Sequence, residues 1–151
     1  MVGSRSDGLA LGAPYHVGTT TITWTARDAS GNQASCTQTI VVNDTQAPTI
    51  TGAAANPSTL WPPNHRMVDV AINYTVTDNC TPSSQVVCTL SVTSNEGTSA
   101  DWVVVDAHHV QLRADRNAGG NGRTYTITIT CRDSGGNTST ATVTVTVPHN
   151  Q

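Results

Sequence analysis

Apolar and polar residues alternate along much of this chain, and the alternation predicts β-strands. Two stretches are clearest: every second residue is apolar from Val68 to Val76, and again from Tyr125 to Cys131. A period of two places such residues on one face of a strand. We therefore expect these two faces to line a core.

The same reasoning predicts seven strands in the larger, C-terminal part of the chain. They are expected at residues 49–51, 67–77, 86–93, 102–105, 110–114, 124–131 and 138–147. Short strands at this spacing are typical of a sandwich of two sheets. The predicted fold class is all-β.

An internal repeat divides the chain. Residues 19–42 (TTTITWTARDASGNQASCTQTIVV) overlay residues 124–147 (TYTITITCRDSGGNTSTATVTVTV) without a gap. Each copy contains two alternating segments joined by Asp-x-x-Gly-Asn, the pattern of a β-hairpin and its turn. Because only the second copy has a full domain before it, we expect residues 1–46 to be the end of a truncated domain and 47–151 a complete one.

Composition supports strands and argues against several partners. About a sixth of the residues are Thr, Val is abundant, and only 11% are charged, with a net charge of −3. β-Branched residues favour strands, and nucleic acid is not expected as a partner without a concentrated basic face. The sequence has no apolar run long enough to span a membrane, and residues 1–18 do not look like a signal peptide. A secretion signal, if there is one, is expected outside this chain.

Two stretches resemble known extracellular modules. The segment VGTTTITWTARDASGNQASCTQTIVV resembles the end of a hyalin repeat (HYR) domain. The motifs LWPPNHRMVDV, SNE, LRADR, GRTYTITITCRD and VPHN resemble an immunoglobulin-like domain that follows HYR modules in large secreted bacterial proteins. The resemblance implies an immunoglobulin-like sandwich of about seven strands preceded by a partial HYR segment. It also implies an extracellular or cell-surface location and a role in adhesion, spacing or assembly with a protein or matrix partner.

One pole of the predicted sandwich collects metal-ligand residue types. Alternating strand directions bring together several loops and the C-terminus there, and with them His65, Glu96, Asp101, Asp115 and His149. Imidazoles and carboxylates are ligands for Zn²⁺, and carboxylates also for Ca²⁺. A divalent-metal site that hydrolyses activated esters or phosphoesters is one interpretation. The other is structural: His65 caps its loop by hydrogen bonding, and His149 simply follows the last strand.

Four cysteines allow one or two disulfides in an oxidising compartment. Cys80, Cys88 and Cys131 fall near the pole opposite His65, so any two of them could be bridged. Cys36 aligns with Ala141 in the repeat, and in the HYR pattern its partner would lie in the missing front of the domain. We expect Cys36 to be free or to bridge two molecules.

Two functions remain open from the sequence. The first is a non-catalytic extracellular module, which the exposed N-terminal hairpin could join to a second molecule by strand pairing. The second is a metal-dependent hydrolase at the His65 and His149 pole. Serine nucleophile chemistry is not expected, because no G-x-S-x-G elbow is present.

Overall fold

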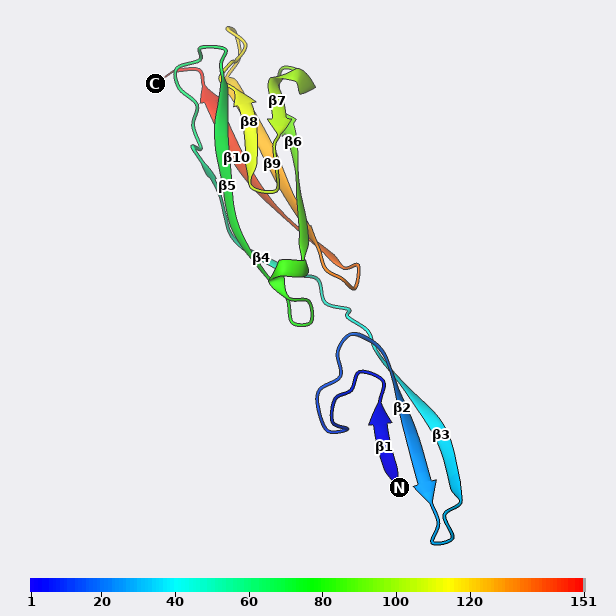
Figure 1. The fold of residues 1–151 in the computed structure, drawn as a ribbon. Helices are drawn as coiled ribbons and strands as arrows, with labels where there is room; N and C mark the ends of the chain where they lie inside the picture. Colours follow the sequence, from blue (N-terminus) through cyan, green and yellow to red (C-terminus); the bar gives the residue numbers. More distant parts are fainter. Residues whose placement is uncertain (151) are drawn as a thin grey trace. The chain divides into compact units, whose positions relative to one another are not determined.

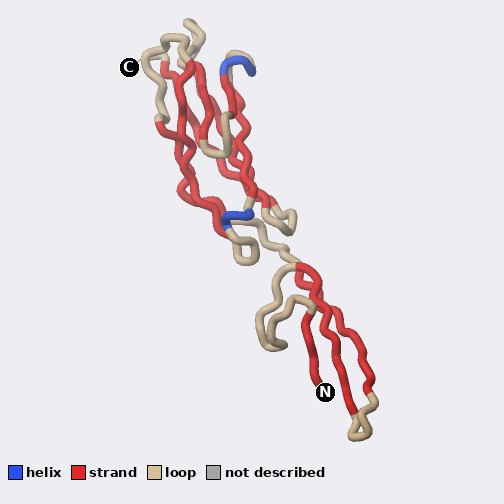
Figure 2. The backbone as a smooth tube through the Cα atoms, in the orientation of Figure 1, coloured by secondary structure: helices blue, strands red, loops and turns tan. Residues whose placement is uncertain are grey.

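The computed structural model describes residues 1–150 and shows an all-β chain in two compact units, Met1–Thr45 and the part that begins at Gln46. Strands dominate both units, and the helices are two short 3-10 turns, Ser83–Gln85 and Ser99–Asp101 (Figure 2). The predicted fold class is confirmed. None of the helices in the described part of the chain has the length and apolar character needed to cross a bilayer.

The first unit is one antiparallel sheet of three strands (Figure 1). The strands are β1 (Val2–Arg5), β2 (Gly18–Arg27) and β3 (Gln33–Val42), in the order β1-β2-β3. The strands β2 and β3 form the predicted hairpin, with Trp24 opposite Cys36. Ile22 is the only hydrophobic residue of the described unit that is fully buried.

The second unit is a sandwich of two antiparallel sheets. One sheet has the order β4-β5-β8-β7, with β4 (Thr49–Asn56), β5 (Met67–Thr77), β8 (His109–Arg113) and β7 (Trp102–Val104). The other has the order β10-β9-β6, with β10 (Thr138–Pro148), β9 (Gly122–Arg132) and β6 (Val87–Ser94). In chain order these are the four-plus-three sheets of a constant-type immunoglobulin domain.

Both predicted apolar stripes lie in the core of this sandwich. Val70 and Ile72 of β5 face Tyr125, Ile127 and Ile129 of β9, and all five are at most 1% exposed. The rest of the cluster is Leu60, Leu90, Val92, Val110, Leu112, Ala114, Cys131, Val143, Val145 and Val147. The alternation in the sequence therefore reports burial, because successive side chains of a strand point to opposite sheet faces.

Strand β4 is longer than the sequence predicts. The expected strand ended at Thr51, whereas β4 continues to Asn56 after a register shift between Thr51 and Ala54. Gly52 occupies that shift with φ +67°, a backbone conformation that favours glycine. A bulge inserts an extra residue and interrupts the alternation, which explains why the second half of this strand is hidden in the sequence.

The two Asp-x-x-Gly-Asn segments form matching turns. In each, the Asp carboxylate accepts hydrogen bonds from the backbone and side-chain amides of the Asn, at 2.8 and 2.8 Å for Asp28 and at 2.8 and 2.9 Å for Asp133. Gly31 and Gly136 have φ values of +91° and +94°. The predicted turn role is confirmed in both copies.

Candidate functional site

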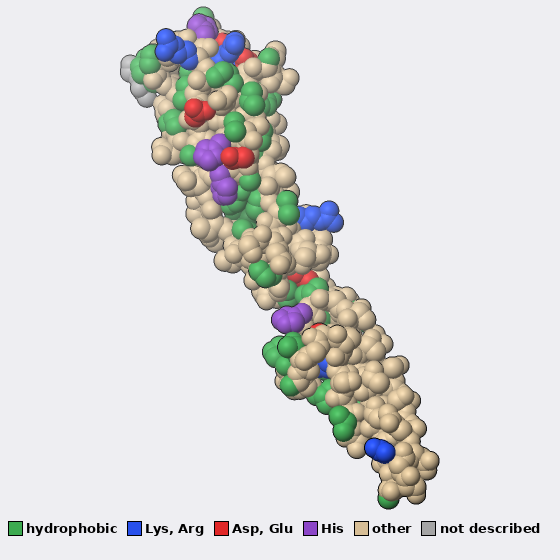
Figure 3. Space-filling view, viewed as in Figure 1, with side chains coloured by type: hydrophobic (Ala, Val, Ile, Leu, Met, Phe, Trp, Pro, Cys, Tyr) green, Lys and Arg blue, Asp and Glu red, His purple; other side chains and the backbone are tan. Residues whose placement is uncertain are grey.

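The pole that carries the C-terminus of the second unit gathers the residue types that the sequence singled out. Histidines, arginines and acids are visible at this end in Figure 3. The Nδ1 of His65 lies 3.1 Å from Oδ1 of Asp115, so these two predicted residues do meet. His65 is 73% exposed and adopts φ +62°, held by a hydrogen bond from its backbone amide to Ala114.

His149 is engaged elsewhere at the same pole. Its Nε2 lies 3.1 Å from the carbonyl oxygen of Ala118, and its Nδ1 lies 3.1 Å from Oδ1 of Asn150. Its own carbonyl accepts a hydrogen bond from Arg116 at 2.9 Å. These contacts fix the end of β10 against the loop before β9.

Glu96 and Asp101 face arginines. Asp101 lies 3.3 Å from Nη1 of Arg123 and 3.5 Å from Nε of Arg113, while Glu96 lies 3.9 Å from Nε of Arg123 and accepts the Asn117 amide at 3.0 Å. Arg123 is 3% exposed, so these carboxylates balance a buried cation. These ion pairs hold the segment that contains Glu96 and Asp101 against strand β9.

The buried arginine is also held by Tyr125. Arg123 donates to the Tyr125 hydroxyl at 2.7 Å, and that hydroxyl donates to the Arg113 carbonyl at 2.9 Å. Burial opposes the charge of Arg123, yet the hydrogen bond to Tyr125 and the neighbouring Asp101 raise its pKa above the usual value. Burial likewise raises the pKa of the Tyr125 hydroxyl, so the phenol stays neutral.

This role of Arg123 was not predicted, although the sequence carries a signal for it. Arg123 precedes Tyr125 by two residues, and therefore lies on the same, inward face of β9. An arginine at an inward position requires buried carboxylates. Among the described residues, no three of the five predicted ligands bring ligand atoms within 4.8 Å of one another. The metal site at this pole stays a prediction.

The opposite end of the second unit carries a different acidic pair. Carboxylate oxygens of Asp78 and Asp133 lie within 4.8 Å of each other, and Oδ2 of Asp78 is buried without a hydrogen-bond partner. Oδ1 of Asp78 accepts the amides of Cys80 and Thr81 at 2.9 and 2.7 Å. Carboxylate oxygens are ligands of the kind that an ion such as Ca²⁺ takes.

Among the described residues one disulfide is present, and it selects one of the cysteine pairings that the sequence left open. Cys88 of β6 bonds to Cys131 of β9, directly opposite each other in the ladder of one sheet. Immunoglobulin domains of antibodies instead bridge their two sheets. Cys36 on β3 is an exposed free thiol, as expected.

The sheet of the first unit repeats the design of the sheet β6-β9-β10. Trp24 pairs with Gly3 on one side and Cys36 on the other, just as Ile129 pairs with Leu90 and Ala141. The strand order β1-β2-β3 is thus that of β6-β9-β10. In the second unit the corresponding face is buried under the sheet β4-β5-β8-β7.

Part of this face is covered in the first unit by the loop between β1 and β2. Arg5 projects from β1 into that loop, where its guanidinium lies 3.9 Å from the centre of the Tyr15 ring. Its Nε donates a hydrogen bond of 3.0 Å to the Asp7 carboxylate. Its remaining donors reach the carbonyls of Ala10, Ala13 and Pro14. The loop is folded around a buried cation and covers Ile22.

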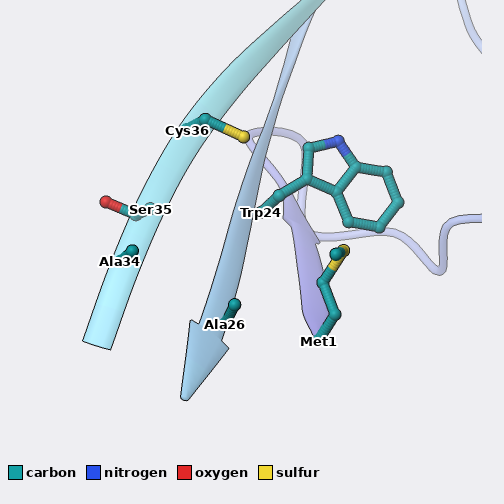
Figure 4. A pocket seen from close by; sticks show the side chains of 6 residues that line it. All are labelled: Met1, Trp24, Ala26, Ala34, Ser35 and Cys36. Carbon is teal, nitrogen blue, oxygen red and sulfur yellow. The ribbon is translucent and has the colours of Figure 1, made fainter. Parts of the chain in front are cut away.

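The other part of the face remains bare. Met1, Trp24, Ala26, Ala34, Ser35 and Cys36 line an open hollow of about 400 Å³. Figure 4 shows the Trp24 indole and the Met1 side chain on one side of the sheet, with the Ser35 hydroxyl pointing away from them. The indole lies over Gly3, where a Cβ would come within 2.7 Å of the ring. Glycine at this position therefore lets the tryptophan lie flat on β1.

The two-sheet architecture and the disulfide define an immunoglobulin-like module of the extracellular type, because disulfides persist in oxidising compartments. Residues 3–42 match the family model of the HYR domain, which confirms the resemblance for the first unit. The match does not extend to the second unit, whose described residues form the two-sheet sandwich. No curated protein matches the chain.

Proposed function

We propose that this chain is a non-catalytic module of an extracellular or cell-surface protein that serves adhesion, spacing or assembly. The observation that carries the proposal is the HYR match at residues 3–42, next to a disulfide-bridged immunoglobulin-like sandwich. The first unit is the end of a larger HYR domain in this proposal. Its partner is a protein or a matrix component.

The charges at the His65 pole support a structural role for that pole. Glu96 and Asp101 neutralise Arg123, and His149 bonds to the backbone of the neighbouring loop. A metal centre needs three or more protein ligands whose lone pairs are available. Binding surfaces, rather than a reacting group, therefore perform the proposed function.

The decisive experiment compares the wild type with the His65→Ala, His149→Ala double variant. Elemental analysis and hydrolysis of p-nitrophenyl acetate, with and without added Zn²⁺, are measured on both proteins. We expect no stoichiometric metal and equal background hydrolysis. Metal bound by the wild type together with turnover that the double variant loses would overturn the proposal in favour of a hydrolase.

A further inference from the structure

The end of the second unit opposite the His65 pole brings two acidic side chains together. Asp78 directly follows β5 and Asp133 is one residue past β9, so each comes from a different sheet of the sandwich (Figure 1). Their carboxylate oxygens lie within 4.8 Å of each other. Asp133 is 6% exposed, and Asp78 is partly buried. Two like charges are therefore held side by side with little access to water.

No cation of the described chain balances this pair. Among residues 1–150, no arginine or histidine forms an ion pair with Asp78 or Asp133. At the other pole the buried Asp101 lies 3.3 Å from Nη1 of Arg123. Buried charges are stable only when they are paired or bind a metal. The Asp78 and Asp133 pair therefore calls for a cation from outside the chain.

One oxygen of the pair gives independent evidence for a ligand. Oδ1 of Asp78 accepts the amides of Cys80 and Thr81, and both oxygens of Asp133 accept hydrogen bonds from Asn137. Oδ2 of Asp78, in contrast, is buried and accepts no hydrogen bond from the described residues. Buried acceptors without a partner are rare and costly in folded proteins. A bound cation would supply the partner that this oxygen lacks.

The atoms around the pair indicate which cation it is. No imidazole or thiol of the described chain joins the two carboxylates within 4.8 Å. The neighbouring side chains of Thr81 and Ser134 carry hydroxyl oxygens, which lie 2.8 Å apart. Oxygen ligands suit a hard cation, whereas Zn²⁺ and Cu²⁺ favour nitrogen and sulfur. Ca²⁺ also tolerates irregular geometry and completes its shell with carbonyl oxygens and water.

We propose that Asp78 and Asp133 bind one Ca²⁺ ion between the loop after β5 and the β9–β10 turn. The ion neutralises the pair and gives Oδ2 of Asp78 a partner. It also ties the two sheets together, which the Cys88–Cys131 disulfide does not do because it lies within one sheet. The ion stabilises the fold, so the site neither requires nor excludes the proposed role in adhesion, spacing or assembly.

The expected affinity is low. Extracellular calcium modules bind their ion with dissociation constants of about 0.1–1 mM. An ion held this loosely leaves the protein during purification in calcium-free buffer. It therefore does not add to the metal that elemental analysis would detect at the His65 pole, and the two tests remain separate.

Asp78→Asn and Asp69→Asn provide a matched pair of variants. Asp78→Asn removes one charge of the pair and keeps the shape of the side chain. Asp69→Asn removes the same charge from an exposed position of β5, where the carboxylate accepts a hydrogen bond from Gln111 at 2.8 Å. Isothermal titration calorimetry of the full chain with CaCl₂ at constant ionic strength measures the dissociation constant. Circular dichroism in EDTA checks that each variant is folded.

We expect the wild type to bind one Ca²⁺ with a dissociation constant of about 0.1–1 mM. Asp69→Asn should keep this value, and Asp78→Asn should raise it by about tenfold or more, because even changes one shell further from a metal cost that much. No calcium binding by the wild type, equal weakening by both variants, or an equal response to Mg²⁺ would overturn the inference.

Amide NMR spectra of the wild type locate the ion without any substitution. On addition of CaCl₂ we expect the largest shifts at Cys80, Thr81 and Ser134, whose amides lie next to the two carboxylates. Shifts concentrated at Glu96 and Asp101 instead would place the ion at the other pole and overturn the inference.

Discussion

Two arginines, Arg5 and Arg123, occupy inward positions of strands where an aliphatic residue would be the usual choice. They are 6% and 3% exposed, and each is surrounded by carboxylate and aromatic partners. Buried charges are tolerated only with such partners. Each arginine therefore fixes a loop, the β1–β2 loop in the first unit and the Glu96–Asp101 segment in the second.

Removing the Tyr125 hydroxyl should destabilise the second unit. Tyr125→Phe removes the hydroxyl that accepts from Arg123 and donates to the Arg113 carbonyl, at a cost of about 1–3 kcal/mol in the free energy of unfolding. Tyr74→Phe is the control, because the Tyr74 hydroxyl makes one bond, to the Ala107 carbonyl at 2.8 Å. Urea unfolding of both variants measures the difference. Equal losses would show that Tyr125 does not organise the cluster.

The Asp133 turn should make the stability of the second unit depend on pH. Burial opposes ionisation of Asp133, but its hydrogen bonds from Asn137 lower its pKa below the ordinary 3.8. A lowered folded-state pKa contributes stability above about pH 4, which is lost as the pH falls through the folded-state value. Asp133→Asn should therefore lower the melting temperature at pH 6, and this difference should shrink toward pH 2.

Asp28→Asn makes the corresponding test in the first unit. Hydrogen bonds from the Asn32 side chain and backbone lower the pKa of Asp28 below 3.8 in the same way. Its effect should appear in the unfolding of the first unit alone. A pH-independent difference for both variants would contradict the assignment of the turns as carboxylate-dependent.

At the scale of elements, the strands β6 and β9 are joined both by a ladder and by a covalent bond. The Cys88–Cys131 disulfide closes a loop with a sequence separation of 43 residues. A cross-link of this span is expected to contribute about 4 kcal/mol by restricting the unfolded chain. Cys88→Ala, Cys131→Ala should lower the unfolding free energy of the second unit by that amount, measured in urea.

Cys36→Ser is the control for the disulfide. Cys36 lies in the other unit and takes no part in the bridge, so this change should leave unfolding of the second unit unaltered. The reductant-treated wild type should match the double variant. A reduced protein as stable as the oxidised one would contradict the expected contribution.

The strands were largely predictable from the sequence, and the reasons lie in particular residues. The stripes from Val68 to Val76 and from Tyr125 to Cys131 have one inward and one outward face, so their period of two reports directly on burial. The second half of β4 was not predictable, because the bulge at Gly52 breaks the alternation.

The candidate sites were less predictable than the strands. Topology placed His65 beside Asp115, but residue type alone could not say that Glu96 and Asp101 face Arg123. The uncovered face of the first sheet, which carries Trp24, was also not predictable from the sequence. Alternation identifies the inward face of a strand without showing what packs on it. The sequence spacing allowed a disulfide between any two of Cys80, Cys88 and Cys131. The register of β6 and β9 places Cys88 opposite Cys131 and so selects that pair.

At the scale of the whole molecule, the two units differ greatly in how much apolar surface they bury. The described core cluster belongs entirely to the second unit, whereas the first has Ile22 as its one fully buried hydrophobic residue. Small units with little buried surface are marginal when alone. The first unit should therefore be the less stable of the two.

This difference should appear as two thermal transitions. We expect the first unit to melt at the lower temperature, because it buries little apolar surface. Differential scanning calorimetry of the full chain measures both transitions. A single transition would contradict the expected independence of the two units.

The position of the disulfide also determines how far the second unit can extend when it is pulled from its ends. Tension passes from Cys88 to Cys131 through the sulfur bridge, so the residues between them stay slack while the strands separate. The unfolded oxidised unit should be about 150 Å shorter than the reduced one. Optical-tweezer extension with and without reductant measures this length, and equal extensions would contradict it. In a surface protein, oxidation of these two cysteines would then limit the length to which the unfolded unit can be stretched.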